Sequence, residues 1–355
     1  MFYNLYHLII KRNSTYYSGG IKKLKDANFF AKDRFIKHDY CILTSSEKNN
    51  SSLHIAFNVD INFILQAGVV ITSILEQNHN INFNFHIFTS EITEKHLQAL
   101  EKTAYKYHCN CYVHLMNMQP FEGFHIKHPR FNRVAYIRVY MPKIMKNYCR
   151  YYAYIDADMV CVGDMHDYFK IDLNGKAVAA VPEIKSAAKL LISNLQLKSN
   201  RYLNSASMWI DTNKWEEEQI TERCFELQNV DPRKFHCHDQ DVLNLTLDGD
   251  WTPLPNKFNF LHSDETSNSE EVLLYHFWGR SKPWKIVLSD YDKIWRHYLN
   301  ISFWDNIQND YPPKTPDNYF IYRDAGRYLR THSEYLKALS CYFWYVILKI
   351  KKFLI

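Results

Sequence analysis

Short apolar runs separate longer, more polar segments in the first half of the chain. Residues 53–60 and 111–116 are such runs, rich in β-branched and aromatic side chains. Residues 82–90 instead alternate between apolar and polar positions with period two. These patterns predict three strands, of which the one at 82–90 is expected to be half-buried.

Two segments between these strands have the period of a helix. Residues 62–78 are apolar over about four turns and predict a largely buried helix. Residues 91–107 carry apolar side chains on one face, with Ser90 as the expected N-cap. Strands that alternate with helices predict an α/β fold with a mainly parallel sheet, covered on both faces. Such sheets bind ligands at the carboxyl ends of their strands.

The same apolar rhythm divides the chain into three parts. Residues 1–52 are polar and irregular and are expected to form an N-terminal extension. Residues 53–285 carry the regular pattern, including a helix expected around 133–145, and predict one α/β domain. Residues 286–355 become aromatic and basic and predict a C-terminal helical segment.

In the run YYAYIDADMV, residues 151–160, two acids separated by one residue follow an aromatic and apolar stretch. A single aspartate after a strand is most often a turn former or a helix cap. In an extended chain, however, residues i and i+2 point to the same side, so Asp156 and Asp158 would lie close together and repel one another. A divalent cation removes that repulsion, and hard oxygen ligands suit Mn²⁺ or Mg²⁺.

The segment LLYHFWGRSKPW supplies further candidates for the same site. His276 is either a core histidine or a third ligand, and an imidazole beside two carboxylates favours Mn²⁺ over Mg²⁺. Lys282 can neutralise a phosphate, and Gly279 lets a backbone N–H approach one. Neither GxGxxG nor GxxxxGK[ST] occurs in the chain, which argues against the common nucleotide-binding loops and against a nucleotidyltransferase.

Six segments in order resemble glycosyltransferase family 8, and most of all its lipopolysaccharide core branch. The resemblance covers residues 53–285 through HIAFNVDINF, AYIRVY, YIDADMVCVGDM, YLNSASMWIDTNKW, HDQDVLN and HFWGRSKPW. It implies a GT-A fold, a Rossmann-like mixed sheet. It also implies a retaining, Mn²⁺-dependent enzyme, with Mg²⁺ as a possible replacement, that moves a hexose from UDP-glucose or UDP-galactose to a lipopolysaccharide core oligosaccharide.

The resemblance also implies roles for individual residues. The implied metal ligands are Asp156, Asp158 and His276. The implied contacts to the sugar nucleotide are Asn58, Asp60, Asn62, Phe63, Arg138, Ala157, Glu183, Gly279 and Lys282. The residues that would line the reacting sugar and act in catalysis are Asn204, Asp239 and Gln240. Ala206 stands where the family usually has glycine and leaves the identity of the sugar open. The acceptor also stays open between core oligosaccharide, capsule, protein and glucan, and a binding module that has lost catalysis is a further alternative.

Charge and cysteine content limit the possible partners of the protein and its possible location in the cell. The formal net charge of +5 equals that of residues 319–355 alone, which argues for a local basic patch and against nucleic acid as a partner. The apolar run 338–348 is too short to span a bilayer, which needs about 20 residues. It fits either a docked helix or, as we expect, an interfacial helix on an anionic membrane. Eight cysteines without CxxC pairs, and no recognisable signal peptide, indicate a cytoplasmic protein. The resemblance and the basic, apolar tail together imply a peripheral place on the cytoplasmic face of a bacterial inner membrane.

Overall fold

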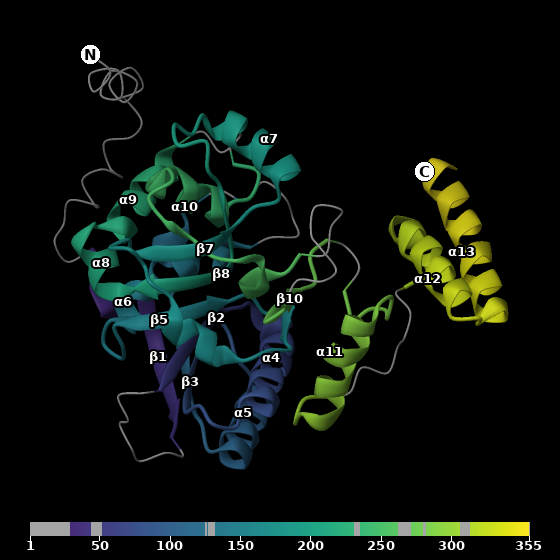
Figure 1. Cartoon of the computed structure of the whole chain (residues 1–355), viewed down its shortest axis with the longest axis horizontal. Coiled ribbons are helices and arrows are strands. Elements are labelled where there is room, and N and C mark those ends of the chain that lie inside the picture. Colours follow the sequence, from purple (N-terminus) through teal and green to yellow (C-terminus); the bar gives the residue numbers. More distant parts are fainter. Residues whose placement is uncertain are drawn as a thin grey trace.

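The protein, seen here as a computed structural model, has an α/β body and a helical hairpin at its C-terminal end (Figure 1). The structure describes residues 29–43, 52–124, 126, 132–230, 235–261, 271–279, 282–305 and 313–354. Expectations for residues 1–28 therefore lie outside the described residues.

A mixed eight-stranded sheet forms the centre of the body, which confirms the α/β class. Its four inner strands β4, β3, β2 and β5 are parallel, whereas β1 and β8 run antiparallel to their inner neighbours. The strands in spatial order are β1 (Ile36–Ile42), β4 (Asn110–Met116), β3 (Phe83–Thr89), β2 (Leu53–Asn58), β5 (Tyr151–Ile155), β8 (Leu203–Asp211), β7 (Val178–Pro182) and β9 (Thr252–Pro253).

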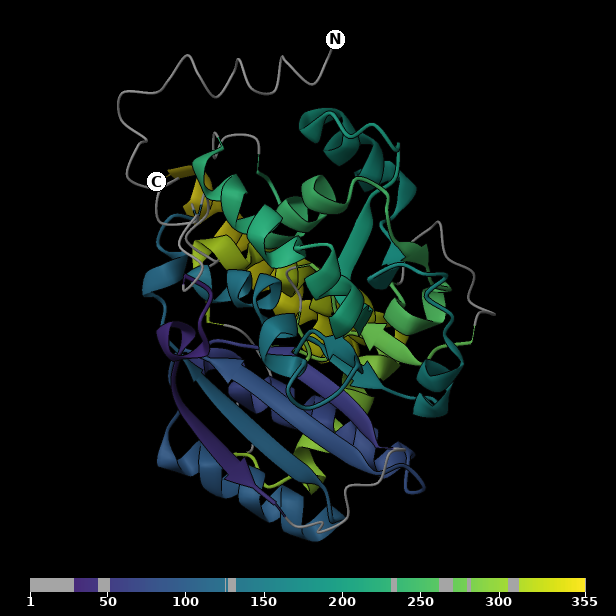
Figure 2. The same cartoon turned by 90° about the vertical axis from the view of Figure 1, so that its left-hand side faces the viewer.

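Helices cover both faces of this sheet, and Figure 2 shows the strands between the two helical layers. One layer, packed on the first hydrophobic cluster, holds α4 (Ile64–Gln77), α5 (Glu94–Tyr107) and α11 (Asp290–Ile301). The other layer holds α6 (Met141–Met145), α7 (Lys185–Leu195), α8 (Thr212–Glu217), α9 (Ile220–Glu226) and α10 (Asp239–Leu247). Because both faces are covered, β3 is buried along its whole length and not half-buried as its alternation predicted.

Three further local predictions differ from the structure. The N-cap of α5 is Thr93, whose side chain accepts a hydrogen bond from the backbone N–H of His96, and not Ser90. The helix expected over 133–145 is a 3-10 helix, η3 (Arg133–Val139), followed by α6, which starts with Pro142 in its first turn. The N-terminal part is not wholly irregular, because α3 (Lys32–Phe35) leads into β1, the edge strand of the sheet.

A second, two-stranded sheet joins β6 (Met159–Cys161) to β10 (Leu274–His276) in antiparallel register. His276 pairs with Met159, the residue next to Asp158. Residues 156–158 form a turn between β5 and β6, so the two acids do not lie on an extended chain as expected. They converge because the chain turns between them.

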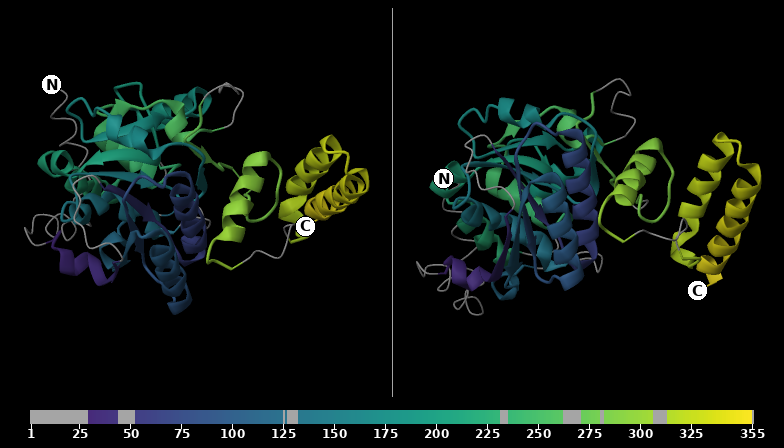
Figure 3. Two further views of the ribbon diagram at one scale, coloured as in Figure 1. Left: turned by 60° about the horizontal axis from the view of Figure 1, so that its bottom comes forward. Right: turned by 90° about the horizontal axis from the view of Figure 1, so that it is seen from below.

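The C-terminal hairpin consists of α12 (Tyr319–Thr331) and α13 (Tyr335–Leu354), and both views in Figure 3 show α11 between it and the body. The two helices share a small hydrophobic cluster that includes Ile321, Ala325 and Cys341. Gly326 allows their close approach, because a Cβ there would lie 2.7 Å from the ring of Tyr342. Among the described residues, no helix combines the length and apolar character needed to cross a bilayer.

Three histidines form a hydrogen-bonded row across β2, β3 and β4. His54 Nδ1 lies 3.0 Å from His86 Nε2, and His86 Nδ1 lies 3.2 Å from His114 Nε2. The row ends where His114 Nδ1 meets Asp39 Oδ1 on β1 at 2.8 Å. If every imidazole is neutral and protonated at Nδ1, each donates to the next and the carboxylate accepts the last hydrogen. Burial lowers the pKa of all three histidines, that of His54 to about 4.

This row predicts a loss of stability on mild acidification. The unfolded chain binds protons near the ordinary histidine pKa of 6.5, whereas folded His54 stays neutral down to about 4. The free energy of unfolding is therefore expected to fall between pH 6.5 and 4, by about 1.4 kcal/mol per pH unit for each withheld proton. Urea unfolding at several pH values should show a shallower slope for His54→Gln than for wild type. His297→Gln, at an exposed site, is the control, and equal slopes for His54→Gln and wild type would contradict the prediction.

Candidate active site

The residues singled out from the sequence gather at one edge of the main sheet. Asn58 ends β2, Asp156 follows β5 and Glu183 follows β7. The amino end of the antiparallel strand β8, with Asn204, reaches the same edge, and β10 delivers His276. This is the edge where ligands bind in sheets of this kind.

Two carboxylates and an imidazole converge at this edge. One ligand atom each from Asp156, Asp158 and His276 lies within 4.8 Å of the others. His276 Nε2 is 3.3 Å from Asp158 Oδ1, and Lys282 Nζ is 2.8 Å from Asp158 Oδ2. Two hard oxygen donors and one imidazole nitrogen suit a divalent cation such as Mn²⁺ or Mg²⁺.

The two carboxylates of this cluster differ electrostatically. Burial raises the pKa of Asp156, and the nearby charge of Asp158 adds to this effect while Arg138 opposes it. Burial acts in the same direction on Asp158, but His276 and Lys282 lower its pKa well below the ordinary value. A bound cation would favour the charged form of both groups, so the donor set fits a metal ion.

Arg138 holds the metal-side carboxylate and a second carboxylate together. Its side chain is only 8% exposed, with Nη2 3.0 Å from Asp156 Oδ1 and Nε 2.7 Å from Asp239 Oδ2. Tyr154 also donates to Asp156 Oδ1 at 2.5 Å. Burial raises the pKa of Asp239 to about 6, although Arg138 opposes this. The buried guanidinium therefore ties Asp239 to the cluster of Asp156, Asp158 and His276 and limits its movement.

The side-chain amides of Gln240 and Asn204 form a second set of hydrogen bonds in the site, around Glu183. Gln240 Oε1 accepts from Ser205 N at 2.9 Å, and Gln240 Nε2 donates to Glu183 Oε2 at 3.3 Å. Asn204 Nδ2 donates to the same Glu183 oxygen at 2.9 Å. A chain of contacts results, running from Asp158 through His276, Asn259, Asn204, Glu183, Gln240, Ser205 and Arg138 to Asp156.

The expected nucleotide-binding turn follows β2. Asp60 caps η1 (Ile61–Phe63) by accepting from Asn62 N at 2.8 Å. Asn58 Nδ2 donates to Ala135 O at 2.9 Å, and its buried Oδ1 meets no hydrogen-bond donor among the described residues. That oxygen can accept a hydrogen bond from a ligand N–H group.

An aromatic contact links this turn to Lys282, a residue expected to bind phosphate. The ring of Trp284 lies 5.8 Å from that of Phe63, and Lys282 Nζ lies 5.8 Å from the Trp284 ring. Gly279 has φ +87°, and a Cβ built there would meet no atom within 4 Å. Its backbone can therefore be approached closely by a ligand.

The structure thus brings all the singled-out residues to one sheet edge, with Ala157 buried in the turn between the two acids. Sequence reasoning missed Tyr154, Ser205 and Asn259. Tyr154 could have been found, because it lies on β5 two residues before Asp156, which directly follows that strand. Asn259 carries no such signal.

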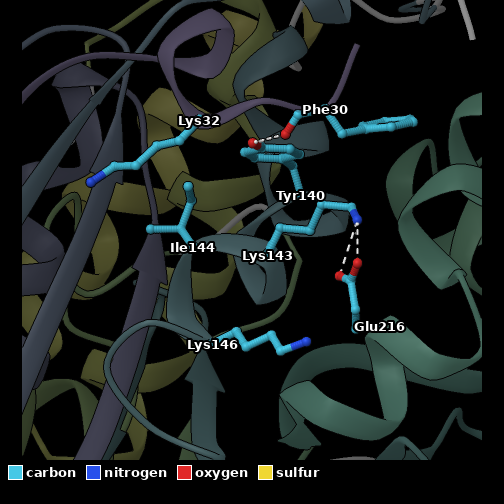
Figure 4. Close-up of a pocket in the computed structure, with 7 residues that line it drawn as sticks. All are labelled: Phe30, Lys32, Tyr140, Lys143, Ile144, Lys146 and Glu216. Carbon is cyan, nitrogen blue, oxygen red and sulfur yellow. Dashed lines mark hydrogen bonds and ion pairs between the residues drawn. The ribbon is translucent and has the colours of Figure 1, made fainter. Parts of the chain in front are cut away.

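A cavity of about 230 Å³ lies elsewhere, beside α6 (Figure 4). It is lined by Phe30, Lys32, Tyr140, Lys143, Ile144, Lys146 and Glu216. Lys143 is paired with Glu216 at 3.0 Å and with Glu222 at 2.7 Å, so its charge is already compensated. None of the candidate site residues lines this cavity.

Known proteins are similar to this chain in sequence and in fold. A lipopolysaccharide 1,2-glucosyltransferase of Escherichia coli (strain K12) is 25% identical over 302 residues, which are 81% of this chain and 88% of that protein. The lipopolysaccharide glucosyltransferase WaaO of the same strain is 26% identical over 349 residues, 91% of this chain and 98% of that protein.

A solved structure, galactosyltransferase LgtC in complex with donor and acceptor sugar analogues, has a TM-score of 0.63 at 19% identity. It covers 70% of this chain and 96% of LgtC, which shows that the fold is of the GT-A type. The family model for glycosyl transferase family 8 matches residues 54–287. The chain therefore belongs to glycosyltransferase family 8.

Proposed function

We propose that the protein is a retaining, metal-dependent hexosyltransferase that moves glucose or galactose from a UDP-sugar to a lipopolysaccharide core oligosaccharide. The convergence of Asp156, Asp158 and His276 carries this proposal, together with the similarity to lipopolysaccharide glucosyltransferases. We assign catalysis to residues 53–285 and membrane association to residues 286–355. Residues 1–52 remain an N-terminal extension that contributes β1 to the sheet.

Asp156, Asp158 and His276 would hold the metal ion, with Mn²⁺ favoured by the imidazole ligand. When bound, the ion supplies Lewis-acid stabilisation of the charge that develops on the leaving diphosphate. Lys282 adds a second positive charge at the same place, and the open backbone of Gly279 can donate a hydrogen bond to a phosphate oxygen. The diphosphate then leaves without a protonating acid.

The other residues would bind and orient the donor. The free Oδ1 of Asn58 suits an N–H donor of the nucleobase, beside the turn formed by Asp60, Asn62 and Phe63. Asn204, Glu183 and Gln240 present amide and carboxylate groups to sugar hydroxyls. Their mutual hydrogen bonds hold them in place before the donor binds, which reduces the cost of ordering them.

In the reaction the bond from the anomeric carbon to the diphosphate breaks, and a bond from that carbon to an acceptor oxygen forms. The acceptor proton passes to the departing diphosphate. Gln240 is an amide and a poor nucleophile, and the ion pair with Arg138 at 2.7 Å weakens Asp239 as one. We therefore assign both residues to positioning and charge stabilisation, with attack on the face from which the diphosphate leaves.

The hairpin would bring the enzyme to a lipid-anchored acceptor. Apolar side chains of α13 are exposed at spacings of three and four residues: Leu336, Leu339, Phe343, Val346, Ile350 and Phe353. Lys349, Lys351 and Lys352 lie near the C-terminal end of the same helix, where Lys352 also pairs with Asp317 at 2.6 Å. An apolar stripe with basic residues suits an interfacial helix on anionic lipid, with the enzyme on the cytoplasmic face of the membrane.

A donor screen tests the activity. UDP-glucose, UDP-galactose and UDP-N-acetylglucosamine are incubated with Mn²⁺, with and without truncated core oligosaccharide, and UDP release is measured. We expect acceptor-dependent release with one of the two hexose donors, and an α-linked product by NMR. His276→Ala should lower kcat/KM at least 100-fold, since metal stabilisation is worth several kcal/mol. Release that persists in EDTA would refute the metal-dependent mechanism, and transfer only to another glycan would change the acceptor.

Asp239→Asn and Gln240→Ala are expected to lower turnover while leaving UDP binding intact. Both residues begin α10, whereas the turn that would hold the nucleoside is formed by residues 60–63. Isothermal titration with UDP and Mn²⁺ checks binding, and steady-state rates check turnover. Loss of UDP binding in both variants would contradict these roles.

Flotation with phosphatidylcholine vesicles, with and without phosphatidylglycerol, tests the membrane assignment. The protein is expected to float only with the anionic vesicles, and each lysine contributes about 1 kcal/mol at low salt. Leu339→Glu should abolish flotation, whereas Leu190→Glu, an equally exposed leucine on α7, should not. Wild-type protein that stays in the soluble fraction at low salt refutes the assignment. A dimer that Leu339→Glu dissociates would instead assign the stripe to a second copy of the chain.

A further inference from the structure

Asn259 links the metal side of the site to the sugar side. It ends η7 (Asn256–Asn259) and is 1% exposed. Its amide lies between His276 Nδ1, 2.9 Å from Asn259 Oδ1, and Asn204 Oδ1, 2.9 Å from Asn259 Nδ2. Backbone hydrogen bonds from Phe260 N to Leu274 O, and from His276 N to Phe260 O, hold this segment against β10. The position of the amide is therefore determined by both neighbouring elements.

The orientation of Asn204 follows from two partners whose roles are unambiguous. Its Oδ1 accepts from the backbone N–H of Ala206 at 3.0 Å, and a backbone nitrogen can only donate. Its Nδ2 lies 2.9 Å from a carboxylate oxygen of Glu183, which in the ionised form can only accept. The amide oxygen of Asn204 is therefore the atom that faces Asn259.

The orientation of Asn259 and the tautomer of His276 follow in turn. An acceptor at Asn204 requires the NH₂ group of Asn259 on that side, which leaves the Asn259 oxygen facing His276 Nδ1. An amide oxygen only accepts, so Nδ1 carries the hydrogen. In the neutral imidazole the lone pair then lies on Nε2, the nitrogen 3.3 Å from Asp158 Oδ1.

We propose that Asn259 is a positioning residue that holds His276 in the tautomer able to ligate a metal ion through Nε2, and at the same time orients Asn204 toward the donor sugar. This inference rests on the proposed function of the site. Groups that orient a ligating histidine commonly contribute 10- to 100-fold to metal affinity, so the effect is large enough to measure. Asn259 thereby couples metal binding to the geometry of the sugar pocket.

Two substitutions separate the two roles of Asn259. Asn259→Ala removes both contacts and should weaken Mn²⁺ binding by about 10- to 100-fold, measured by electron paramagnetic resonance titration with UDP present. Asn259→Asp keeps an acceptor for His276 but faces Asn204 Oδ1 with a second acceptor. It should bind Mn²⁺ nearly as well as wild type while kcat falls. Loss of stability alone would not produce this split.

Asn78→Ala is the matched control. Asn78 is also a buried asparagine, and its amide bonds to Ile74 O, Gly163 O and Met165 N on the far side of β6. It should lower the unfolding midpoint without changing Mn²⁺ affinity. If Asn259→Ala binds Mn²⁺ as tightly as wild type, the inference is overturned. Wild-type protein that binds neither Mn²⁺ nor UDP would overturn the proposed function itself.

A measurement on the wild-type protein needs no substitution at Asn259. Long-range ¹H–¹⁵N spectra of histidine-labelled protein, recorded with UDP and diamagnetic Mg²⁺ bound, distinguish the two neutral tautomers, and comparison with His276→Gln identifies the signals of His276. We expect the hydrogen on Nδ1. A hydrogen on Nε2 would overturn the inference even if the variants at Asn259 failed to fold.

Discussion

The antiparallel pairing of β6 with β10 is the contact on which the site depends. It aligns His276 with Met159, and so brings an imidazole from a distant part of the chain beside Asp158. Without that pairing the two acids would face each other across a turn with only Lys282 and Arg138 to balance their charge. The short sheet formed by β6 and β10 is therefore what places His276 beside the two acids.

The polar contacts in the chain from Asp158 to Asp156 have a common physical basis. Each of its members is wholly or partly buried, and a buried polar group without a partner is costly, so each is held by its neighbours. Arg138 is central, because one buried guanidinium contacts Asp156, Asp239 and Ser205. Its charge holds in one place the carboxylates that burial and mutual repulsion would separate. The groups proposed to bind the donor are thus already held in position by contacts within the protein.

The histidine row and the C-terminal hairpin treat polar and apolar side chains in different ways. The row places polar side chains in the sheet interior by pairing each imidazole with the next and the last with Asp39. The hairpin buries one side of α13 against α12 and leaves an apolar stripe exposed on the other. In the histidine row each imidazole has a hydrogen-bond partner. The hairpin instead leaves an apolar surface that suits a further partner.

The local pattern of the sequence determined the core strands, helices α4 and α5, and the family to which the chain belongs. It also identified Asp156, Asp158 and His276, because residue type and motif order suffice for that. It did not reveal the turn between the acids, the burial of both faces of β3, or the strand β1 hidden in a polar segment. The contacts of Asn259 and Ser205 with the site, and the hydrogen bonds of the histidine row, were determined by tertiary structure alone. Their roles arise from contacts between segments far apart in the chain, and no local pattern records which distant side chain will complete a hydrogen bond.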